Sequence, residues 1–495
     1  MTSAGEQVLL SGLTTLGLGG PARKFVAAGT EADLVAAVRA ADDAGEPLLI
    51  LGGGSNLVIA DGGFPGTVVQ VATAGVRAEP EPLGRARVTV AAGEDWDGLV
   101  ARCGRHGLAG LECLSGIPGR TGATPIQNVG AYGQEVAETI ATVRVYDRKA
   151  GEVTDLPAAE CGFGYRTSSF KQDPSGRYVV LAVTFRLARG PRSSPVRYPE
   201  LARALAVAEG EPAPLGAVRD AVLRLRRGKG MVLDPADPDS RSAGSFFTNP
   251  VLDTAQFTAL RAAVTAHRGP DVAIPQFPAG PGQVKVPAAW LIGQAGFGKG
   301  YPGDPGRRPS RPHISGKHTL ALVNPGGAST ADLVALAREI RDRVRDLFGV
   351  TLAVEPVLVG VSVRPAWSGE LPALVDAVRA GRQGEAEPIR RGGAREAEAP
   401  ARVGVDHLPV RAGRPELARS AGAGGHLDLG AVRGAQGRHA LAGHREGAVR
   451  ADGPRLRGRA VAAAQGGRVP VPGEHPHVSH APAAVADDRP GRRCS

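Results

Sequence analysis

The chain has 495 residues, a formal net charge of +10 and an aromatic content of 4%. This length allows two or three domains, and no apolar run reaches the roughly 18 residues that a membrane-spanning helix requires. The four cysteines (Cys103, Cys113, Cys161 and Cys494) have no C-x-x-C spacing, and their positions fit no common metal-binding template. This cysteine usage favours a reducing, cytoplasmic setting. We also expect no signal peptide, because the N-terminus lacks a basic segment followed by an apolar one.

The positive charge is concentrated beyond residue 370, where Ala, Gly, Arg, Pro and His dominate. That segment contains no Lys, Phe, Tyr, Asn, Met or Thr, so it cannot bury enough apolar surface to offset the entropy of ordering. We therefore expect residues 370–495 to be a disordered or non-native tail, arising from a reading-frame artefact or a fusion scar. Its histidines, such as His475, His477 and His480, follow this composition, and we predict no metal site there.

The N-terminal part of the chain opens with a glycine-rich segment, residues 8–29, that leads into a first strand. Thr30 is a favourable N-cap followed by Glu31 and Asp33, which predicts a helix with apolar residues at helical spacing from Leu34 onward. The apolar run 48–50 then predicts a short buried strand. Further strands are expected at 67–71 and 87–91, and a second helix is expected from residue 95.

A glycine loop, Gly52-Gly53-Gly54-Ser55-Asn56, follows the buried strand. Three glycines without Cβ atoms allow positive φ angles and a close approach of the backbone to a ligand. Consecutive N–H groups in such a turn can hold phosphate oxygens. A tight turn between two strands is the alternative interpretation. The loop has neither the G-x-G-x-x-G fingerprint nor a Walker lysine, so it is not a standard nucleotide motif.

A second long loop, residues 114–133, is too rich in glycine and proline for a helix or a central strand. Loops of this length inside a domain are usually functional or disordered. Its small, mostly uncharged residues favour an ordered loop around a ligand, and Gln127 and Asn128 could recognise the edge of a heterocycle. A solvent-exposed linker is the alternative interpretation.

The remaining elements divide the folded part in two. Strands at 143–147 and 179–187 close a first domain, 8–190, and residues 190–198 resemble a linker. A second domain, 199–361, is predicted to contain an amphipathic helix at 215–227, a strand at 318–324, a helix capped by Thr330 and a final strand at 350–360. The segment 296–300 (GFGKG) looks like a nucleotide loop, but it follows no strand and we interpret it as a connector.

Six stretches of the chain, in this order, resemble the UDP-N-acetylenolpyruvoylglucosamine reductase family. The resemblance covers residues 8–361 and implies an α+β protein: an FAD-binding domain of the vanillyl-alcohol-oxidase type, followed by a C-terminal α/β substrate domain. The six stretches are 52–56 (GGGSN), 115–119 (SGIPG), 125–133 (PIQNVGAYG), 163–171 (FGYRTSSFK), 243–250 (AGSFFTNP) and 352–356 (LAVEP).

The resemblance also implies a reaction. NADPH would reduce noncovalently bound FAD, and the flavin would reduce UDP-N-acetylglucosamine enolpyruvate to UDP-N-acetylmuramate, a precursor of peptidoglycan. We expect a cytoplasmic enzyme that is a monomer and has no specific nucleic acid or membrane partner. Noncovalent binding is expected because neither glycine-rich stretch contains His or Cys.

Three residues match the family's catalytic positions. Ser245 would donate the proton after hydride addition, Arg166 would face the substrate carboxylate as charge develops on it, and Glu355 would share in stabilising or protonating the same intermediate. Without the family motifs, these residues would be interpreted as a turn serine, a surface arginine and a carboxylate at a strand end.

The binding residues are also assigned by the resemblance. For the UDP substrate they are Tyr198 on a mobile loop, Lys229, Asn249 and, more weakly, Gln294, against the alternatives of a solvated lysine, a turn asparagine and a surface amide. For FAD they are Gly52, Gly53, Gly54, Ser55, Asn56, Ser115, Gly116, Ile117, Pro118, Gly119, Gly122, Gln127, Asn128, Gly130, Ala131, Tyr132 and Gly133. Thr124 departs from the family, which commonly has a small apolar residue there.

Two other functions compete with this one. A flavin oxidase with the same type of FAD domain would not need the Ser245 motif or Lys229, and it should react quickly with oxygen. A basic nucleic-acid-binding protein is suggested by the sequence pI of 9.8, but the chain has few aromatics and no stacking pattern with basic residues.

Overall fold

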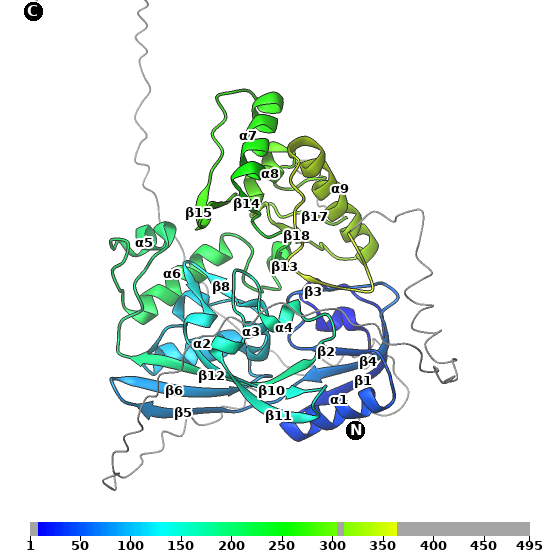
Figure 1. Ribbon diagram of the computed structural model, residues 1–495, viewed down its shortest axis with the longest axis vertical. Coiled ribbons are helices and arrows are strands. Elements are labelled where there is room, and N and C mark those ends of the chain that lie inside the picture. Colours follow the sequence, from blue (N-terminus) through cyan, green and yellow to red (C-terminus); the bar gives the residue numbers. More distant parts are fainter. Residues whose placement is uncertain (1–7, 304–310, 364–495) are drawn as a thin grey trace, which may run out of the picture. The chain divides into compact units, whose positions relative to one another are not determined.

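The computed structural model describes residues 8–303 and 311–363, and Figure 1 shows how their helices and strands are arranged. The tail that the sequence predicts to be disordered, residues 370–495, lies outside the described residues. No helix in the described ranges has both the length and the apolar character needed to cross a membrane.

The first sheet is parallel and has three strands. Its order is β1 (Ala22–Ala28), β4 (Phe64–Val71) and β2 (Leu48–Leu51). Helix α1 (Glu31–Asp43) packs on it through Leu34, Val38 and Ala41, and the Thr30 side chain accepts the N–H of Asp33. The predicted capped helix is therefore confirmed, and so is a strand at 48–50, although Leu48, Leu49 and Ile50 are only half-buried. Strand β2 runs directly into the glycine loop.

The second sheet is antiparallel and carries most of the N-terminal core. Strand β12 (Tyr178–Arg189) lies at its centre between β10 and β6. Helix α2 (Trp96–Arg105) buries Trp96 near Phe185, with ring centroids 6.0 Å apart. The other strands are β5 (Val76–Glu81), β6 (Arg85–Ala91), β7 (Leu108–Ala109), β10 (Ile140–Asp147) and β11 (Glu152–Pro157).

Two helices, α5 (Pro199–Leu205) and α6 (Leu215–Arg227), form a small cluster of their own with Cys113 and Val196. The predicted helix at 215–227 is confirmed. The segment 190–198 differs from its prediction as a linker, because Val196 is fully buried and Ser193 N–H donates to the Ala213 carbonyl at 2.7 Å. The polar composition of residues 190–198 gives no indication of this packing.

A separate hydrophobic core holds the C-terminal part, and it includes Leu16, Leu18 and Val58 from the N-terminal part. The proposed limits 8–190 and 199–361 therefore remain a prediction.

The C-terminal part contains three helices and six strands within the described residues, apart from a short strand given below. The helices are α7 (Thr254–Arg268), α8 (Ala288–Gln294) and α9 (Thr330–Phe348), and the strands are β13 (Ser242–Ser245), β14 (Val251–Asp253), β15 (Phe277–Gly280), β16 (Gln283–Lys285), β17 (His313–Ile314) and β18 (Ala321–Val323).

Three details of this part differ from the sequence predictions. Ser329, not Thr330, caps α9, while the Thr330 hydroxyl is buried and donates to the Ile59 carbonyl. The strand predicted at 318–324 is shortened to β18. The strand predicted at 350–360 is reduced to β19 (Val357–Val359), since Pro356 has no N–H to continue a ladder.

Strand β19 pairs in parallel with β3 (Leu57–Ile59), which directly follows the glycine loop. The end of the described chain is thus tied to the loop that the sequence singles out. The long loop 114–133 contains a 3₁₀ turn at Thr121–Ala123 and a helical turn, α3 (Thr124–Gln127), that its composition did not predict. Near its end, β8 (Gly130–Ala131) forms a small hairpin with β9 (Gln134–Glu135), which directly follows the loop. Helix α4 (Ser169–Gln172) packs against α3.

Candidate active site

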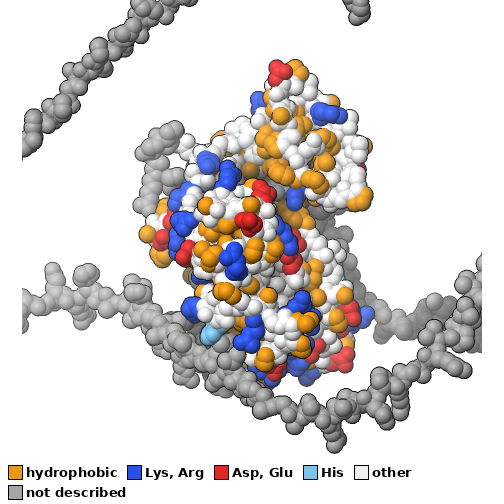
Figure 2. All heavy atoms as spheres, turned by 90° about the vertical axis from the view of Figure 1, so that its left-hand side faces the viewer, with side chains coloured by type: hydrophobic (Ala, Val, Ile, Leu, Met, Phe, Trp, Pro, Cys, Tyr) orange, Lys and Arg blue, Asp and Glu red, His pale blue; other side chains and the backbone are white. Residues whose placement is uncertain are grey.

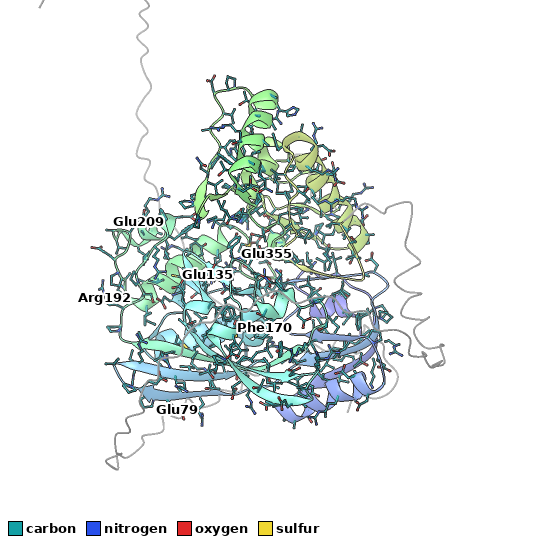
Figure 3. All side chains as sticks on the ribbon, in the orientation of Figure 1. Glu79, Glu135, Phe170, Arg192, Glu209 and Glu355 are labelled. Carbon is teal, nitrogen blue, oxygen red and sulfur yellow. The ribbon has the colours of Figure 1, made fainter. Side chains whose placement is uncertain are left out.

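A cavity of about 950 Å³ collects most of the residues that the sequence predicts to be functional. Its lining comes from the glycine loop after β2, from the 117–135 segment, from the region around α4, and from the C-terminal part at β13, Asn249 and Glu355. Figure 3 shows Glu135 and Glu355, two of its lining residues, in the middle of the described part, while Glu79, Arg192 and Glu209 lie at the periphery.

The two glycine-rich loops meet at one wall of the cavity. A Cβ atom on Gly53 would lie 2.7 Å from the Gly119 Cα, and a Cβ on Gly122 would lie 2.5 Å from the Ala92 Cβ. Gly54 has φ 61°, and its Cβ would collide with the Leu13 carbonyl. Only glycine allows these backbones to come so close, so the glycines here are required by packing as well as available to a ligand.

Part of the cavity wall is apolar. The residues that form this part are Leu49, Ile50, Ala92, Trp96, Ile117, Val179 and Val180. A cavity with an apolar section and a glycine-rich section suits a ligand that has both a flat ring system and a phosphate group. The volume lies near the upper end of the range for small-molecule sites.

Three predicted cofactor residues support the loop and do not line the cavity. The Ser115 hydroxyl donates to the Glu112 carbonyl at 2.7 Å, and the Gly116 N–H donates to Asp97 Oδ1 at 2.6 Å. Asn128 is 1% exposed, and its amide nitrogen donates to Glu135 Oε2 and to the Gly164 carbonyl, each at 2.8 Å. The Asn128 amide therefore makes its hydrogen bonds within the protein and does not line the cavity.

Arg166 and Glu355, far apart in the sequence, form an ion pair in the cavity wall. Arg166 Nε lies 3.3 Å from Glu355 Oε1, and Gln127 Nε2 donates to the same oxygen at 3.0 Å. Burial raises the pKa of Glu355, while Arg166, Gln127 and Lys171 act in the opposite direction. Burial therefore favours the neutral form of this carboxyl more than solvent exposure would.

The Arg166 guanidinium is held from its other side by the backbone of the long loop. Nη2 donates to the Gly130 carbonyl at 2.6 Å, and Nη1 donates to the Asn128 carbonyl at 3.4 Å. Arg166 also has φ 55°, a conformation that is rare for residues other than glycine. Such strain is found mostly at functional sites, and here it accompanies a fixed positive charge beside the cavity.

Ser245 ends β13 and lines the cavity on the side of the C-terminal core. A register shift between Ser242 and Ser245 and a φ of 73° at Gly244 turn the strand at this point. Within residues 8–303 and 311–363, the Ser245 hydroxyl makes no hydrogen bond. The Glu355 N–H donates to the carbonyl of Phe246 at 2.9 Å, so the backbones carrying Ser245 and Glu355 are neighbours.

The cationic end of the site is built around Lys229, just after α6. Lys229 Nζ lies 2.6 Å from Glu200 Oε2 and 5.6 Å from the centroid of the Tyr132 ring. Tyr132 stacks edge-on against Tyr198 at 5.4 Å, and burial raises the pKa of Tyr132 to about 12. Tyr198 is 40% exposed, which leaves it at the rim of the cavity.

The two predicted amide contacts differ in position. Asn249 lines the cavity, and its Oδ1 accepts the Ala288 N–H at 2.9 Å. Gln294, at the end of α8, is not among the lining residues; its carbonyl accepts a hydrogen bond from Arg268 Nε at 2.8 Å. The structure therefore brings Asn249 to the site and does not bring Gln294 there.

The polar lining residues that were not predicted from the sequence include Lys171, Arg226 and His318. Burial lowers the pKa of Arg226 to about 10, and its Nε has no partner in the described part of the chain. Burial, together with the nearby Lys229, lowers the pKa of His318 to about 4. The basic residues that end α6 look like an ordinary helix C-terminus, so nothing in the sequence distinguishes Arg226 from its neighbours.

Comparison with known proteins extends these observations. The model of the C-terminal domain of UDP-N-acetylenolpyruvoylglucosamine reductase matches residues 235–359, and that of an FAD binding domain matches residues 22–157. A UDP-N-acetylenolpyruvoylglucosamine reductase from Thermobifida fusca is 56% identical over 362 residues, covering 73% of this chain and 99% of that protein. One from Salinispora arenicola is 58% identical over 356 residues, covering 72% and 95%. The crystal structure of a UDP-N-acetylenolpyruvylglucosamine reductase from Thermus caldophilus is 28% identical with a TM-score of 0.47, covering 72% of this chain and 98% of that one.

Proposed function

The chain belongs to the UDP-N-acetylenolpyruvoylglucosamine reductase family, and we propose that it carries out this reduction with NADPH and noncovalently bound FAD, converting UDP-N-acetylglucosamine enolpyruvate to UDP-N-acetylmuramate for peptidoglycan synthesis. One observation carries the proposal beyond the family assignment. Arg166, Glu355 and Ser245, which come from three distant stretches, line one cavity together with the glycine loop.

The residues of the cavity fit FAD. The close approach of Gly53 to Gly119 forms a cradle that a Cβ atom would fill, and the backbones of residues 52–56 would face the pyrophosphate. The apolar wall would hold the ring system. Cys103, Cys113 and Cys161 are buried and free, which supports noncovalent binding. When bound, FAD supplies the hydride, so the protein must provide binding, charge stabilisation and a proton.

Arg166 would stabilise the substrate carboxylate. As the alkene is reduced, negative charge moves onto this group, and a guanidinium that the Gly130 carbonyl already holds at 2.6 Å needs little reorganisation to meet it. Glu355 would share in stabilising or protonating the same intermediate. Its raised pKa favours the protonated form more than an exposed carboxyl would.

Ser245 would deliver the proton to the substrate carbon. A hydroxyl is a weak acid, so this role requires a fixed geometry and the neighbouring charges. The free hydroxyl of Ser245 at the turned end of β13 leaves it available to a substrate in the cavity. The adjoining Glu355 backbone keeps the two candidate groups on the same wall.

The UDP part of the substrate would be bound at the Lys229 end. Lys229 would pair with the diphosphate, Tyr198 would close over it, and Asn249 would contribute an amide. Gln294 remains a weaker candidate, because it would have to reach the cavity through a movement of α8. Of the predicted FAD contacts, Ser115, Gly116 and Asn128 would act by fixing the loop that carries Ile117, Gly119, Gln127 and Gly130.

We also propose that the protein works as a cytoplasmic monomer without nucleic acid as a partner. Free buried cysteines are in keeping with a reducing compartment. On the face drawn in Figure 2, Lys and Arg side chains alternate with Asp and Glu rather than forming a basic patch. This face therefore gives no electrostatic footprint for nucleic acid.

The function is tested by the absorption spectrum of the purified full chain and by NADPH oxidation with and without UDP-N-acetylglucosamine enolpyruvate. We expect a flavin spectrum, slow NADPH oxidation alone, and fast oxidation coupled to product when the substrate is added. A protein that binds no flavin would refute the proposal. Rapid NADPH or alcohol oxidation by oxygen, with no effect of the enolpyruvyl substrate, would instead indicate a flavin oxidase.

A further inference from the structure

Lys171, on α4, contacts three oxygen atoms around the Arg166–Glu355 pair. Its Nζ donates to Gln127 Oε1 at 2.7 Å, to the Arg166 carbonyl at 3.2 Å and to the Glu355 carbonyl at 3.4 Å. These acceptors belong to three segments that are distant in the sequence. The position of one ammonium group therefore depends on, and helps to fix, the relative placement of all three.

The ammonium also determines how the Gln127 amide is oriented. A lysine ammonium can only donate, so the amide oxygen of Gln127 must face Lys171. The amide NH₂ then faces the opposite way, where it donates to Glu355 Oε1 at 3.0 Å. Arg166 Nε approaches the same carboxylate oxygen at 3.3 Å. Two donors thus converge on Oε1, and the carboxyl group is held in one orientation.

We propose that Lys171 is a positioning residue: by fixing the orientation of the Gln127 amide, it keeps the amide NH₂ and Arg166 on one oxygen of Glu355 and so sets the protonation behaviour of that carboxyl. The inference rests on the proposed function for its consequence in turnover. Its geometric basis, the Lys171–Gln127–Glu355 chain of hydrogen bonds, does not depend on the identity of the substrate.

Removal of the ammonium should change Glu355 in a defined direction. Without Lys171, the Gln127 amide can rotate and turn its oxygen toward Glu355, where it would accept a hydrogen bond from the O–H of the neutral acid and so disfavour the carboxylate. The titratable and charged groups around Glu355 are Arg166, Lys171 and Tyr165. Burial already raises the pKa of Glu355, and the loss of Lys171 should raise it further.

The first experiment compares Lys171→Met with the wild-type full chain. The pH dependence of kcat for UDP-N-acetylmuramate formation is measured, together with flavin reduction by NADPH in a separate half-reaction. The titration of Glu355 defines one limb of this pH profile, whether the protonated or the ionised form is active. We expect the midpoint of that limb to shift to higher pH by about half a pH unit or more, and we expect the flavin content to be retained. Lys149→Met, at an exposed lysine, removes the same charge and should leave the profile unchanged.

A double-mutant cycle distinguishes positioning through Gln127 from a direct charge effect. The profiles of Gln127→Ala and of the Lys171→Met/Gln127→Ala double variant are measured in the same way. If Lys171 acts through the amide, its removal should cause little further shift when Gln127 is absent. An undiminished shift in the double variant, or an unshifted profile in Lys171→Met, would overturn the inference.

Two further arms keep the result interpretable. Lys171→Arg, which retains the positive charge and donors, should give a profile nearer to the wild type than Lys171→Met does. Should the methionine variant lose its flavin, Lys171→Leu, which also has no donor, replaces it in the cycle, with the same outcomes deciding. A wild-type protein that forms no product would refute the proposed function, whereas normal wild-type turnover with an unshifted variant would refute this inference alone.

Discussion

Glu200, on α5, is paired with Lys229, the residue proposed to bind the diphosphate, with Nζ and Oε2 2.6 Å apart. Both side chains are about one-third exposed, at 33% for Lys229 and 35% for Glu200. The site therefore pairs its own cation with a carboxylate. A substrate diphosphate must displace this carboxylate or share the ammonium with it, so Glu200 opposes substrate binding.

Replacement of Glu200 by Gln should strengthen binding of the sugar nucleotide. The change removes the competing negative charge and keeps the side-chain size, and we expect KM for UDP-N-acetylglucosamine enolpyruvate to fall about threefold, a modest effect because the pair is partly solvated. Steady-state kinetics at two salt concentrations measure it. Glu209→Gln removes the same charge from an exposed site and should leave KM unaltered; a higher KM in Glu200→Gln would show that Glu200 assists binding.

Replacement of Ser245 by Ala should separate the two half-reactions. Flavin reduction by NADPH does not require the proton donor, so its rate should stay within about twofold of wild type, whereas product formation should fall by about 100-fold or more. Stopped-flow absorbance measures both steps. Ser175→Ala serves as the control at an exposed serine. Equal losses in the two half-reactions would count against a proton-donor role.

Replacement of Gly53 by Ala should reduce flavin binding. The added Cβ would lie 2.7 Å from the Gly119 Cα, which forces the two glycine-rich loops apart. The ratio of flavin absorbance to protein absorbance should therefore drop severalfold, and the circular dichroism spectrum should stay close to wild type. Gly298→Ala is the matched control, since no atom lies within 4 Å of the Cβ it would add. Full flavin occupancy in Gly53→Ala would show that the cradle is not needed.

The sequence predicted the glycine loop, the helix at 215–227 and the capped first helix because each depends on local chemistry. The expectation that Arg166, Ser245 and Glu355 share one site came from the family resemblance. The periodicity of the sequence carries no information about contacts between residues that are so far apart. The roles of Lys171 and Asn128 were missed for a related reason. A lysine in a polar motif and an amide in a loop carry no sign of whether they face the cavity or the protein.

The same reason explains the errors in the C-terminal part. Residues 350–360 alternate like a strand, but a ladder depends on its partner. Val357–Val359 pairs with β3, whereas Val354 forms only an isolated bridge with Phe247. Thr330 and Ser329 are equally good caps in sequence, and tertiary packing decided between them by burying the Thr330 hydroxyl against Ile59. Local propensity gives way to packing wherever two choices are close in energy.

His318 should make the stability of the protein depend on pH in mildly acidic solution. Its Nδ1 accepts the Leu320 N–H at 3.1 Å, so the neutral ring carries its proton on Nε2. Burial and the nearby cations lower the pKa of His318 from 6.5 to about 4. A group whose pKa is lower in the folded state makes its full contribution to the free energy of unfolding above the pKa of the unfolded state. That contribution is lost as the pH falls toward and through the pKa of the folded state.

The free energy of unfolding should therefore fall between about pH 6.5 and pH 4, by at most about 3 kcal/mol from this residue. Urea unfolding at several pH values measures the trend, and His318→Gln, which cannot be protonated, should show a shallower decline than the wild type. His106→Gln, at an exposed histidine, is the control and should follow the wild-type curve. Parallel curves for His318→Gln and the wild type would mean that the folded state does not hold His318 neutral, and this would contradict the prediction.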